Sequence, residues 1–281
     1  MQKKKIVIIG GTGFIGNSIC RMLKKDKKKF LSLNSKNCDL LKKSAINILK
    51  RNIKNGDVVI FVSAIAPCKN QEQFQKNLDM LMPLMHALKD KKISHLVYIS
   101  SDAVYKDSKN KLNENSLVEP NSIHGLMHQT RENLLKLSFD KKLSIIRPTL
   151  VYGPLDTHNG YGPNYFARKA LVNDKIKIFG NGEEIRDHVY VEDIANLVEK
   201  IIKKKLIGIF NAVSGDPVTF FKLAKLIKEK LNSKSKIKKI KRKGPMPHNG
   251  YRCFDTSILK KKIKKFTPTK YRDGITNFEK I

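Results

Sequence analysis

Cysteines are few in this chain of 281 residues, and no apolar run is long. The four cysteines lie far apart, without a C-x-x-C pair or the spacing of a metal site, so the sequence predicts no disulfide framework and a reducing compartment. The apolar run Ile6–Ile9 follows a lysine-rich segment and is too short for a signal peptide or a membrane span. We therefore expect a cytoplasmic protein without a transmembrane segment.

Acidic residues are also scarce, because 25 aspartates and glutamates stand against 57 lysines and arginines, which gives a formal net charge of +32. Such a charge raises the question of nucleic-acid binding. The lysines are spread over many short runs, however, and these runs lack the interleaved aromatic residues on which single-stranded bases stack. We therefore expect no specific nucleic-acid partner, whereas the positive field would help to attract a phosphorylated substrate.

Apolar, β-branched runs alternate with helical patterns over the first two thirds of the chain. The expected strands are Lys5–Ile9, Phe30–Leu33, Val58–Val62, His95–Ser100 and Leu143–Arg147. The expected helices between them are Phe14–Lys25, Lys42–Arg51, Gln71–Lys89 and Ser122–Phe139. This alternation predicts an α/β fold with a doubly wound parallel sheet, the Rossmann arrangement.

The pattern changes after Pro148, where residues 153–163 carry turn and loop signals. A shorter pattern follows, with extended segments at Lys175–Phe179 and Ile209–Ala212 and helices at Val191–Lys203 and Thr219–Leu231. We expect residues 1–151 and about 191–212 to form the sheet domain. Residues 152–190 and 213–281 are expected to form a smaller C-terminal lobe.

A glycine-rich turn follows the first expected strand and opens the first expected helix, with the spacing G-x-x-G-x-x-G. The first glycine permits a tight turn, the second lets the backbone approach a pyrophosphate, and the third lets helix and strand pack closely. The N-terminus of the helix would then direct its free N–H groups and partial positive charge at the phosphates. The turn therefore predicts a bound dinucleotide, held by Gly10, Thr12, Gly13, Phe14, Ile15 and Gly16.

No carboxylate stands at the end of the second expected strand, where an acid usually binds the adenosine ribose of NAD. Leu33 is followed there by Asn34, Ser35 and Lys36. An acid at this point would repel a 2′-phosphate, but none is present. The lysine is available to pair with such a phosphate. The expected cofactor is therefore NAD or NADP, with Asn34 at the ribose.

Several further segments form a recognisable set. They are Asp39-Leu40, Ser63-Ala64-Ile65-Ala66, S-S-D-A-V-Y at 100–105, Arg147-Pro148, V-Y-G-P at 151–154 and R-D-H-V-Y-V-E-D at 186–193. Together with the glycine turn, they resemble the extended short-chain dehydrogenases/reductases of the NAD-dependent epimerase/dehydratase family over nearly the whole chain. The resemblance implies that Asp39 and Leu40 contact the adenine and that Ser63 and Ala64 lie in a loop beside the cofactor. The structural alternative, which is compatible with an adenine contact, is that Asp39 is the N-cap of a helix over Leu41–Leu49.

The chemistry of this family uses a serine or threonine hydroxyl, a tyrosine, and a lysine four residues after the tyrosine. Ser101 occupies the hydroxyl position. Where the family shows P-x-S-x-Y-G-x-x-K, residues 120–128 read P-N-S-I-H-G-L-M-H, so His124 replaces the tyrosine and His128 the lysine. An imidazole with a pKa of about 6.5 is poised for proton exchange at neutral pH, whereas a phenol at about 10 needs a cationic neighbour. We expect Ser101 to bind the reacting oxygen, His124 to move its proton, and His128 to donate to a cofactor ribose hydroxyl.

Three other interpretations of this histidine pair stay open. The i, i+4 spacing is that of H-E-x-x-H zinc helices, but Gly125 stands at the glutamate position and no third ligand is evident, so we expect no metal. A degenerate protein could keep the cofactor fold as an NAD(P)-binding regulator or scaffold without redox chemistry. Both rings could also be ordinary packed or solvated helix residues.

The smaller lobe is expected to bind the substrate, for which the resemblance implies a nucleotide-activated sugar. In similar proteins the arginine of R-D-x-x-x-V-x-D contacts the diphosphate, a role that falls here to Arg186. Asn164 and Arg252 are further expected diphosphate contacts, and Asp102 is a further expected substrate contact. Family dehydratases carry an Asp-Glu pair at 102–103, which Ala103 interrupts, so the resemblance implies an NAD(P)-dependent epimerase or reductase. Dimers are common in the family, so a homodimer is one expected assembly.

Overall fold

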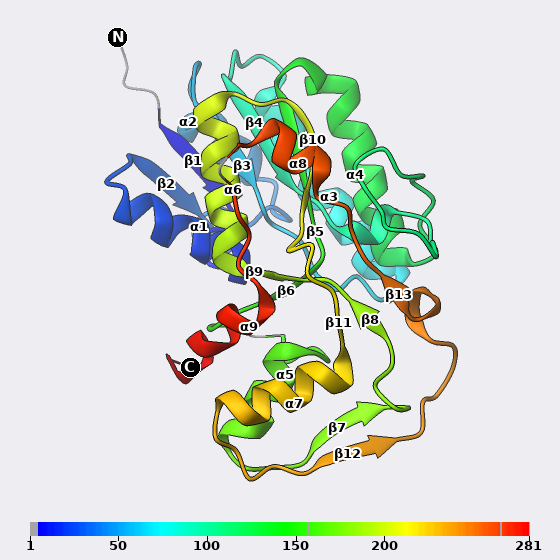
Figure 1. Ribbon diagram of the computed structural model, residues 1–281. Helices are drawn as coiled ribbons and strands as arrows, with labels where there is room; N and C mark the ends of the chain where they lie inside the picture. Colours follow the sequence, from blue (N-terminus) through cyan, green and yellow to red (C-terminus); the bar gives the residue numbers. More distant parts are fainter. Residues whose placement is uncertain (1–4, 157, 265, 281) are drawn as a thin grey trace. The chain divides into compact units, whose positions relative to one another are not determined.

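In a computed structural model of the chain, which describes residues 5–156, 158–264 and 266–280, the protein folds into two compact units (Figure 1). Unit 1 comprises Met1–Lys106, Leu117–Pro148 and Ile194–Asn211, and unit 2 comprises Asp107–Ser116, Thr149–Asp193 and Ala212–Ile281. The segment Asp107–Ser116 belongs to unit 2, although its place in the sequence predicts the sheet domain. Each unit has its own sheet system.

Unit 1 is built on a six-stranded sheet with the order β10-β5-β4-β3-β1-β2. Its strands are β1 (Ile6–Ile9), β2 (Phe30–Leu33), β3 (Val58–Phe61), β4 (His95–Ile99), β5 (Leu143–Pro148) and β10 (Gly208–Ala212). All pairings among the first five strands are parallel, which confirms the predicted doubly wound sheet. The strand order reverses between β1 and β3, so the carboxyl ends of these two strands flank the position at which open α/β sheets bind ligands.

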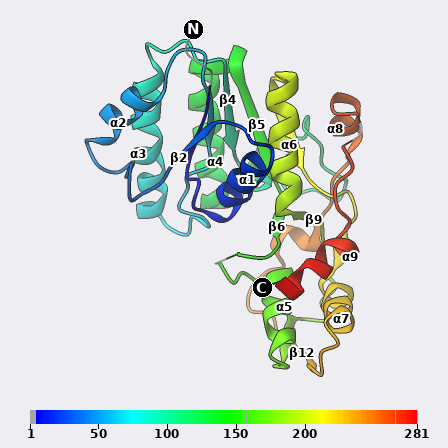
Figure 2. The same cartoon turned by 90° about the vertical axis from the view of Figure 1, so that its left-hand side faces the viewer.

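Helices cover both faces of this sheet. They are α1 (Phe14–Lys25), α2 (Ala45–Asn52), α3 (Gln71–Leu88), α4 (Ile123–Phe139) and α6 (Val191–Lys204). Helices α2, α3 and α4 lie on one face, and α1 and α6 lie on the other (Figure 2). Strand side chains alternate between the faces. Val7, Ile9, Val59 and Phe61 therefore share one face and are buried in a core with residues of α2, α3 and α4.

Unit 2 consists of short strands and helices. The strand pairs are β6 (Leu150–Tyr152) with β9 (His188–Tyr190), β7 (Ile176–Phe179) with β12 (Ile237–Ile240), and β8 (Ile185–Arg186) with both β11 (Val218–Thr219) and β13 (Tyr251–Arg252). The helices are α5 (Pro163–Leu171), α7 (Phe220–Lys230), α8 (Ser257–Lys262) and α9 (Tyr271–Gly274). Aromatic and aliphatic side chains of α5, α7, β7 and the C-terminal segment form a second buried core.

The observed strands of the sheet lie within one residue of the expected bounds at each end. The helix that differs most from its expected bounds is α2, which begins at Ala45 and not at Lys42, because residues 40–44 form turns and a bend. A search of the described helices finds none with the length and apolar character needed to cross a membrane.

Candidate functional site

The turn between β1 and α1 is tied to the ends of two neighbouring strands. Gly10 N–H donates to the Leu33 carbonyl at the end of β2 (2.8 Å), and Ser63 N–H, after β3, donates to the Ile9 carbonyl (3.1 Å). Gly10 has φ +97°, and a Cβ there would lie 2.7 Å from Ser63 N. A Cβ on Gly16 would lie 2.1 Å from the Gly10 carbonyl oxygen, so only glycine lets α1 pack on the turn.

The start of α1 offers uncapped N–H groups. Gly13 is the N-cap residue, no side chain caps the helix, and the first turn contains no acidic residue. Thr12 and Gly13 are exposed, whereas Phe14 and Ile15 are half-buried. A Cβ on Gly13 would meet no protein atom closer than 3.5 Å, so packing within the protein does not require glycine there, whereas a closely apposed ligand would. The turn and the helix start therefore fit the pyrophosphate of a dinucleotide.

Two expected cofactor segments follow the strands on either side of this turn. Asn34 follows β2, and Ser63 and Ala64 follow β3, all of them half-buried. A residue that the sequence did not reveal fixes the second segment: Arg131, buried in α4, donates from Nη1 to the Ser63 carbonyl (2.8 Å) and from Nε to the Asn77 carbonyl of α3 (2.9 Å). Nothing in the sequence near Arg131 indicates that it supports the segment at Ser63, because its hydrogen-bond partners lie more than 50 positions away.

Asp39 and Leu40 occupy the turn region before α2. Asp39 Oδ1 accepts a hydrogen bond from the Leu41 N–H (3.1 Å). Helix α2 begins only at Ala45, with Ser44 as its N-cap residue, so the alternative in which Asp39 caps a helix over Leu41–Leu49 is wrong. The Leu40 side chain is buried in the core of unit 1. The adenine contact of both residues stays a prediction.

Ser101 lies just after β4 and caps the short 3-10 turn η1 (Asp102–Val104). Its Oγ accepts a hydrogen bond from the Ala103 N–H (3.2 Å), which leaves its own hydroxyl proton to donate to another oxygen. The preceding Ser100 is buried, and its hydroxyl donates to Glu132 Oε1 (2.6 Å). The two adjacent serines therefore differ in role. The Ser100 hydroxyl donates its proton to Glu132, whereas the Ser101 hydroxyl only accepts a hydrogen bond from the described residues.

A buried ion pair supports the region behind these serines. Arg147 donates to Glu132 from Nε (2.9 Å) and from Nη2 (2.5 Å), so the pair is bidentate. The Arg147 guanidinium also lies over the ring of Tyr105, 4.7 Å from its centroid. Burial opposes the charged form of Arg147, but the hydrogen bonds and the charge of Glu132 outweigh it, so the pKa of Arg147 is raised. The pair fixes α4 against the carboxyl end of β5, and α4 carries both histidines.

His124 lies in the first turn of α4, where Ser122 is the N-cap and accepts from the Gly125 N–H (3.1 Å). Gly125 allows α4 to approach η1, because a Cβ there would lie 2.0 Å from the Ala103 carbonyl oxygen. The backbone N–H of Cys68 donates to His124 Nδ1 (3.2 Å). A backbone amide can only donate, so Nδ1 carries no proton and neutral His124 holds its proton on Nε2.

His128 is buried one turn further along α4, and its Nδ1 lies 2.8 Å from the hydroxyl oxygen of Tyr98. No other hydrogen bond of this hydroxyl to a described residue is found. Among the described residues, His128 Nδ1 is then the acceptor left for the phenol proton, so Tyr98 donates to it and His128 too is protonated on Nε2. Tyr98 could not be found from the sequence, because a tyrosine in an apolar strand looks like an ordinary core residue.

The two imidazoles contact each other edge to face, with ring centroids 4.8 Å apart. Burial lowers the pKa of His124, although the charge of Asp102 opposes the shift. Burial and then the charges of His124 and Arg131 hold the pKa of His128 well below its usual value. In the part of the chain that the structure describes, no three His, Cys, Asp or Glu side chains are grouped to hold a metal ion.

Unit 2 contains the other expected substrate residues. Asn164 is buried at the start of α5, where its Oδ1 accepts from the Gly153 N–H (3.0 Å) and its Nδ2 donates to Asp156 Oδ2 (2.7 Å). Both ends of its amide are therefore already engaged within the unit. Its observed contacts hold the loop after β6 against α5.

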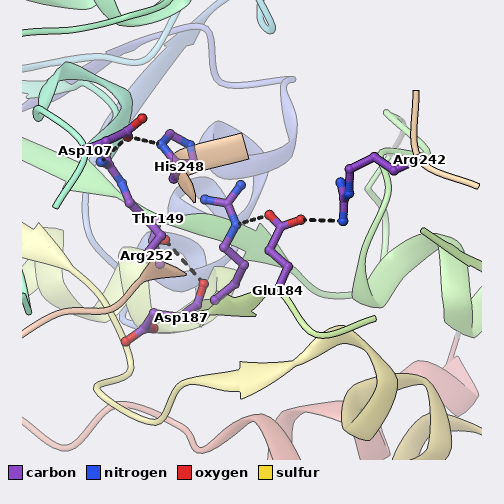
Figure 3. A network of polar contacts seen from close by, with 8 residues as sticks. Asp107, Thr149, Glu184, Asp187, Arg242, His248 and Arg252 are labelled. Atoms are coloured by element: carbon purple, nitrogen blue, oxygen red, sulfur yellow. Dashed lines mark hydrogen bonds and ion pairs between the residues drawn. The ribbon is translucent and has the colours of Figure 1, made fainter. Parts of the chain in front are cut away.

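Arg186 and Arg252 lie on paired strands, β8 and β13, and both are buried. Each is paired with a carboxylate, and Figure 3 shows Arg252 beside Asp107. Glu184 accepts from Arg186 Nε (2.7 Å) and also from Arg242 (3.2 Å), and Arg252 Nη1 donates to Asp107 (3.3 Å). No hydrogen bond from the Nη atoms of Arg186 to any described residue is found, so this edge of the guanidinium can donate to an anion.

Comparison with known proteins places this geometry in context. Residues 6–212 match the family model described as NAD dependent epimerase/dehydratase family. The chain is 26% identical over 306 residues to the uncharacterized UDP-glucose epimerase YtcB of Bacillus subtilis (strain 168), a match that covers 97% of this chain and 96% of that protein. It is 24% identical over 217 residues to the N-acetyl-alpha-D-glucosaminyl-diphospho-ditrans,octacis-undecaprenol 4-epimerase of Escherichia coli O157:H7, over 72% of this chain and 64% of that protein.

Solved structures of similar fold include the UDP-glucose 4-epimerase of Thermus thermophilus in complex with NAD, with a TM-score of 0.84 and 20% identity over 98% of this chain and 99% of that chain. The GDP-L-fucose synthetase of Naegleria fowleri bound to NADP gives a TM-score of 0.86 and 19% identity, over 100% of this chain and 94% of that chain. At these identities the structures establish the fold.

Proposed function

This chain belongs to the NAD dependent epimerase/dehydratase family, and we propose that it is an NAD(P)-dependent epimerase or reductase of a nucleotide-activated sugar. The observation that carries this proposal is the glycine turn. Gly10 and Gly16 are required by contacts inside the protein, whereas the exposed Gly13 is explained by a ligand that approaches the uncapped start of α1. When bound, the nicotinamide exchanges a hydride with a carbon of the sugar.

The cofactor is held by groups at the carboxyl ends of β1, β2 and β3. The N–H groups at the start of α1 bind the pyrophosphate, and Asn34 lies at the adenosine ribose. Ser63 and Ala64 form the wall after β3, which Arg131 keeps in place through the Ser63 carbonyl. His128 donates from Nε2 to the ribose next to the nicotinamide, and Tyr98 fixes the tautomer that makes this donation available.

Ser101 and His124 act on the reacting oxygen of the sugar. The Ser101 hydroxyl and the Nε2–H of His124 are both donors, and two donors on one oxygen stabilise the negative charge that develops there. Proton exchange at His124 Nε2 has a further requirement. The charged imidazolium carries a second proton on Nδ1, which would face the Cys68 N–H, so Cys68 must release His124 before this ring can accept a proton.

The diphosphate of the substrate is assigned to unit 2, where the Nη edge of Arg186 provides donors in a planar arrangement. Glu184 on the opposite edge orients this guanidinium. Arg252 adds a second positive charge on the neighbouring strand β13. The matching relatives named as UDP-sugar enzymes support a nucleoside diphosphate as the activating group.

The test is a turnover assay with the purified protein. NAD⁺, NADP⁺ and their reduced forms are combined with UDP-, dTDP- and GDP-linked sugars, and cofactor absorbance and sugar stereochemistry are followed. Turnover that is lost in His124→Ala while the variant still binds the dinucleotide supports the proposal. If no sugar reacts, and the dinucleotide binds equally to wild type and His124→Ala, the chain is a cofactor-binding protein without redox chemistry and the proposal fails.

A further inference from the structure

The turn that follows β2 offers hydrogen-bond donors at the place where a dinucleotide presents its adenosine ribose. Its position relative to the phosphate turn is fixed, because Gly10 N–H and Gly11 N–H both donate to the carbonyl of Leu33, the last residue of β2 (2.8 and 3.2 Å). The Ser32 side chain also reaches this turn, since a Cβ on Gly11 would lie 2.1 Å from Ser32 Oγ. A ligand whose pyrophosphate occupies the glycine turn therefore has Asn34 and its neighbours beside the ribose.

The side-chain oxygens of this turn are used to build the turn itself. Asn34 Oδ1 accepts from the Lys36 N–H (2.9 Å), and Asn37 Oδ1 accepts from the Asn34 N–H (2.8 Å). Asn37 Nδ2 in addition donates to the Ser32 carbonyl (3.3 Å), and the Asn34 carbonyl accepts from Cys38 N–H (2.7 Å). The loop is thus held by its own amides, and both amide oxygens that could accept from a ribose hydroxyl already have donors.

The groups that the turn leaves for a ligand are donors. No hydrogen bond from Asn34 Nδ2 to the described residues is found, and Ser35 and Lys36 are exposed. The acidic residue closest in sequence, Asp39, accepts from the Leu41 N–H and lies beyond the buried Cys38. An amide N–H, a hydroxyl and an ammonium match a phosphate, which has several acceptor oxygens and a double negative charge, far better than they match a hydroxyl that needs an acceptor.

We infer that the site prefers NADP(H) over NAD(H), and that Asn34, Ser35 and Lys36 bind the 2′-phosphate of the adenosine ribose. The inference rests on the proposed dinucleotide function and narrows it. Asn34 and Lys36 determine the specificity, since Asn34 replaces the carboxylate that would bind a 2′-hydroxyl and repel a phosphate, and Lys36 provides the pairing charge.

The experiment measures binding of NADP⁺ and NAD⁺ to the purified full chain by titration calorimetry, so it does not depend on finding the sugar. We expect NADP⁺ to bind about ten- to a hundredfold more tightly, as one or two charge-assisted hydrogen bonds allow, and this ratio to shrink as salt is added. Lys36→Glu and Asn34→Asp are each expected to cut the ratio about tenfold or more, and the double variant to favour NAD⁺.

Lys29→Glu is the matched control. It makes the same charge change on an exposed lysine, but just before β2, at the end of the strand away from the turn and on the order of 10 Å from Asn34. Its ratio is expected to stay at the wild-type value.

The outcomes separate the inference from the function beneath it. If neither dinucleotide binds, the proposed function fails and the inference falls with it. If both bind equally, or NAD⁺ binds more tightly, the function stands and the inference is overturned. A preference for NADP⁺ that is unchanged in Lys36→Glu and Asn34→Asp, or that falls as much in Lys29→Glu, likewise overturns the assignment to this turn.

Discussion

Gly125→Ala tests whether the contact between α4 and η1 positions the histidine site. A Cβ at this position would lie 2.0 Å from the Ala103 carbonyl oxygen and 2.7 Å from Pro120 Cβ, whereas ordinary contact begins at 3.4 Å. The start of α4 must therefore move by about 1.4 Å from Ala103, the difference between 3.4 and 2.0 Å. Alanine in a free helix is about 1 kcal/mol better than glycine. Overpacking against rigid backbone costs about 1 to 3 kcal/mol, so we expect a net loss of up to about 2 kcal/mol.

The displacement also moves His124, the residue before Gly125, away from the Cys68 N–H and from the turn that carries Ser101. A misplacement of about 1 Å can reduce turnover about a hundredfold, so kcat/KM should fall by that order. Stability is measured by urea unfolding, with Ser138→Ala as a control at an exposed position of the same helix. A Gly125→Ala protein that is as stable as wild type and equally active would show that this contact does not position the site.

Three further results are expected. Glu132→Ala should lower the unfolding free energy by about 3 to 5 kcal/mol in urea, because it leaves the buried Arg147 without its carboxylate, and Glu132→Gln should lose less. Burial lowers the pKa of His188 to about 3, so as the pH falls the unfolded chain binds a proton at this histidine before the folded chain does. The contribution of His188 to stability is therefore complete above about pH 6.5 and is lost as the pH drops toward 3. In unfolding measured as a function of pH, His188→Phe should make this loss of stability smaller. Nitrogen-15 NMR of labelled histidines near neutral pH should show His124 protonated on Nε2 alone; an Nδ1-protonated ring would rule out the Cys68 hydrogen bond.

The central sheet could be read from the sequence because its strands are short, apolar and separated by clear helical patterns. Val58–Phe61 and His95–Ile99 are buried on both sides, and buried parallel strands appear as continuous apolar runs. The start of α2 was less predictable, since Leu40 and Leu41 continue the apolar spacing of the helix although they lie in turns. The order of the strands depends on contacts between segments far apart in sequence, which local patterns do not contain.

The glycine turn was predictable because its three glycines lie within seven consecutive residues, between an apolar strand and an amphipathic helix. The contact that requires glycine at Gly16 lies within this turn, whereas the contact of Gly10 with Ser63 after β3 could not be read from it. The residues that support the catalytic candidates are of the opposite kind. Tyr98, Arg131 and Cys68 act through partners on other elements, and each has an ordinary structural explanation in its own segment.

These distant partners change the chemistry expected from a histidine at the tyrosine position of the family's motif. From the sequence, an imidazole in place of the phenol is a base that needs no cationic helper. In the structure, the Cys68 N–H occupies Nδ1 of His124 and the Tyr98 hydroxyl occupies Nδ1 of His128, so both neutral rings hold their mobile proton on Nε2. Because burial also disfavours the charged form of each ring, the resting pair is two neutral donors. In the proposed site, this pair would polarise an oxygen that bears or gains negative charge, and proton uptake by His124 would require movement of the Cys68 segment.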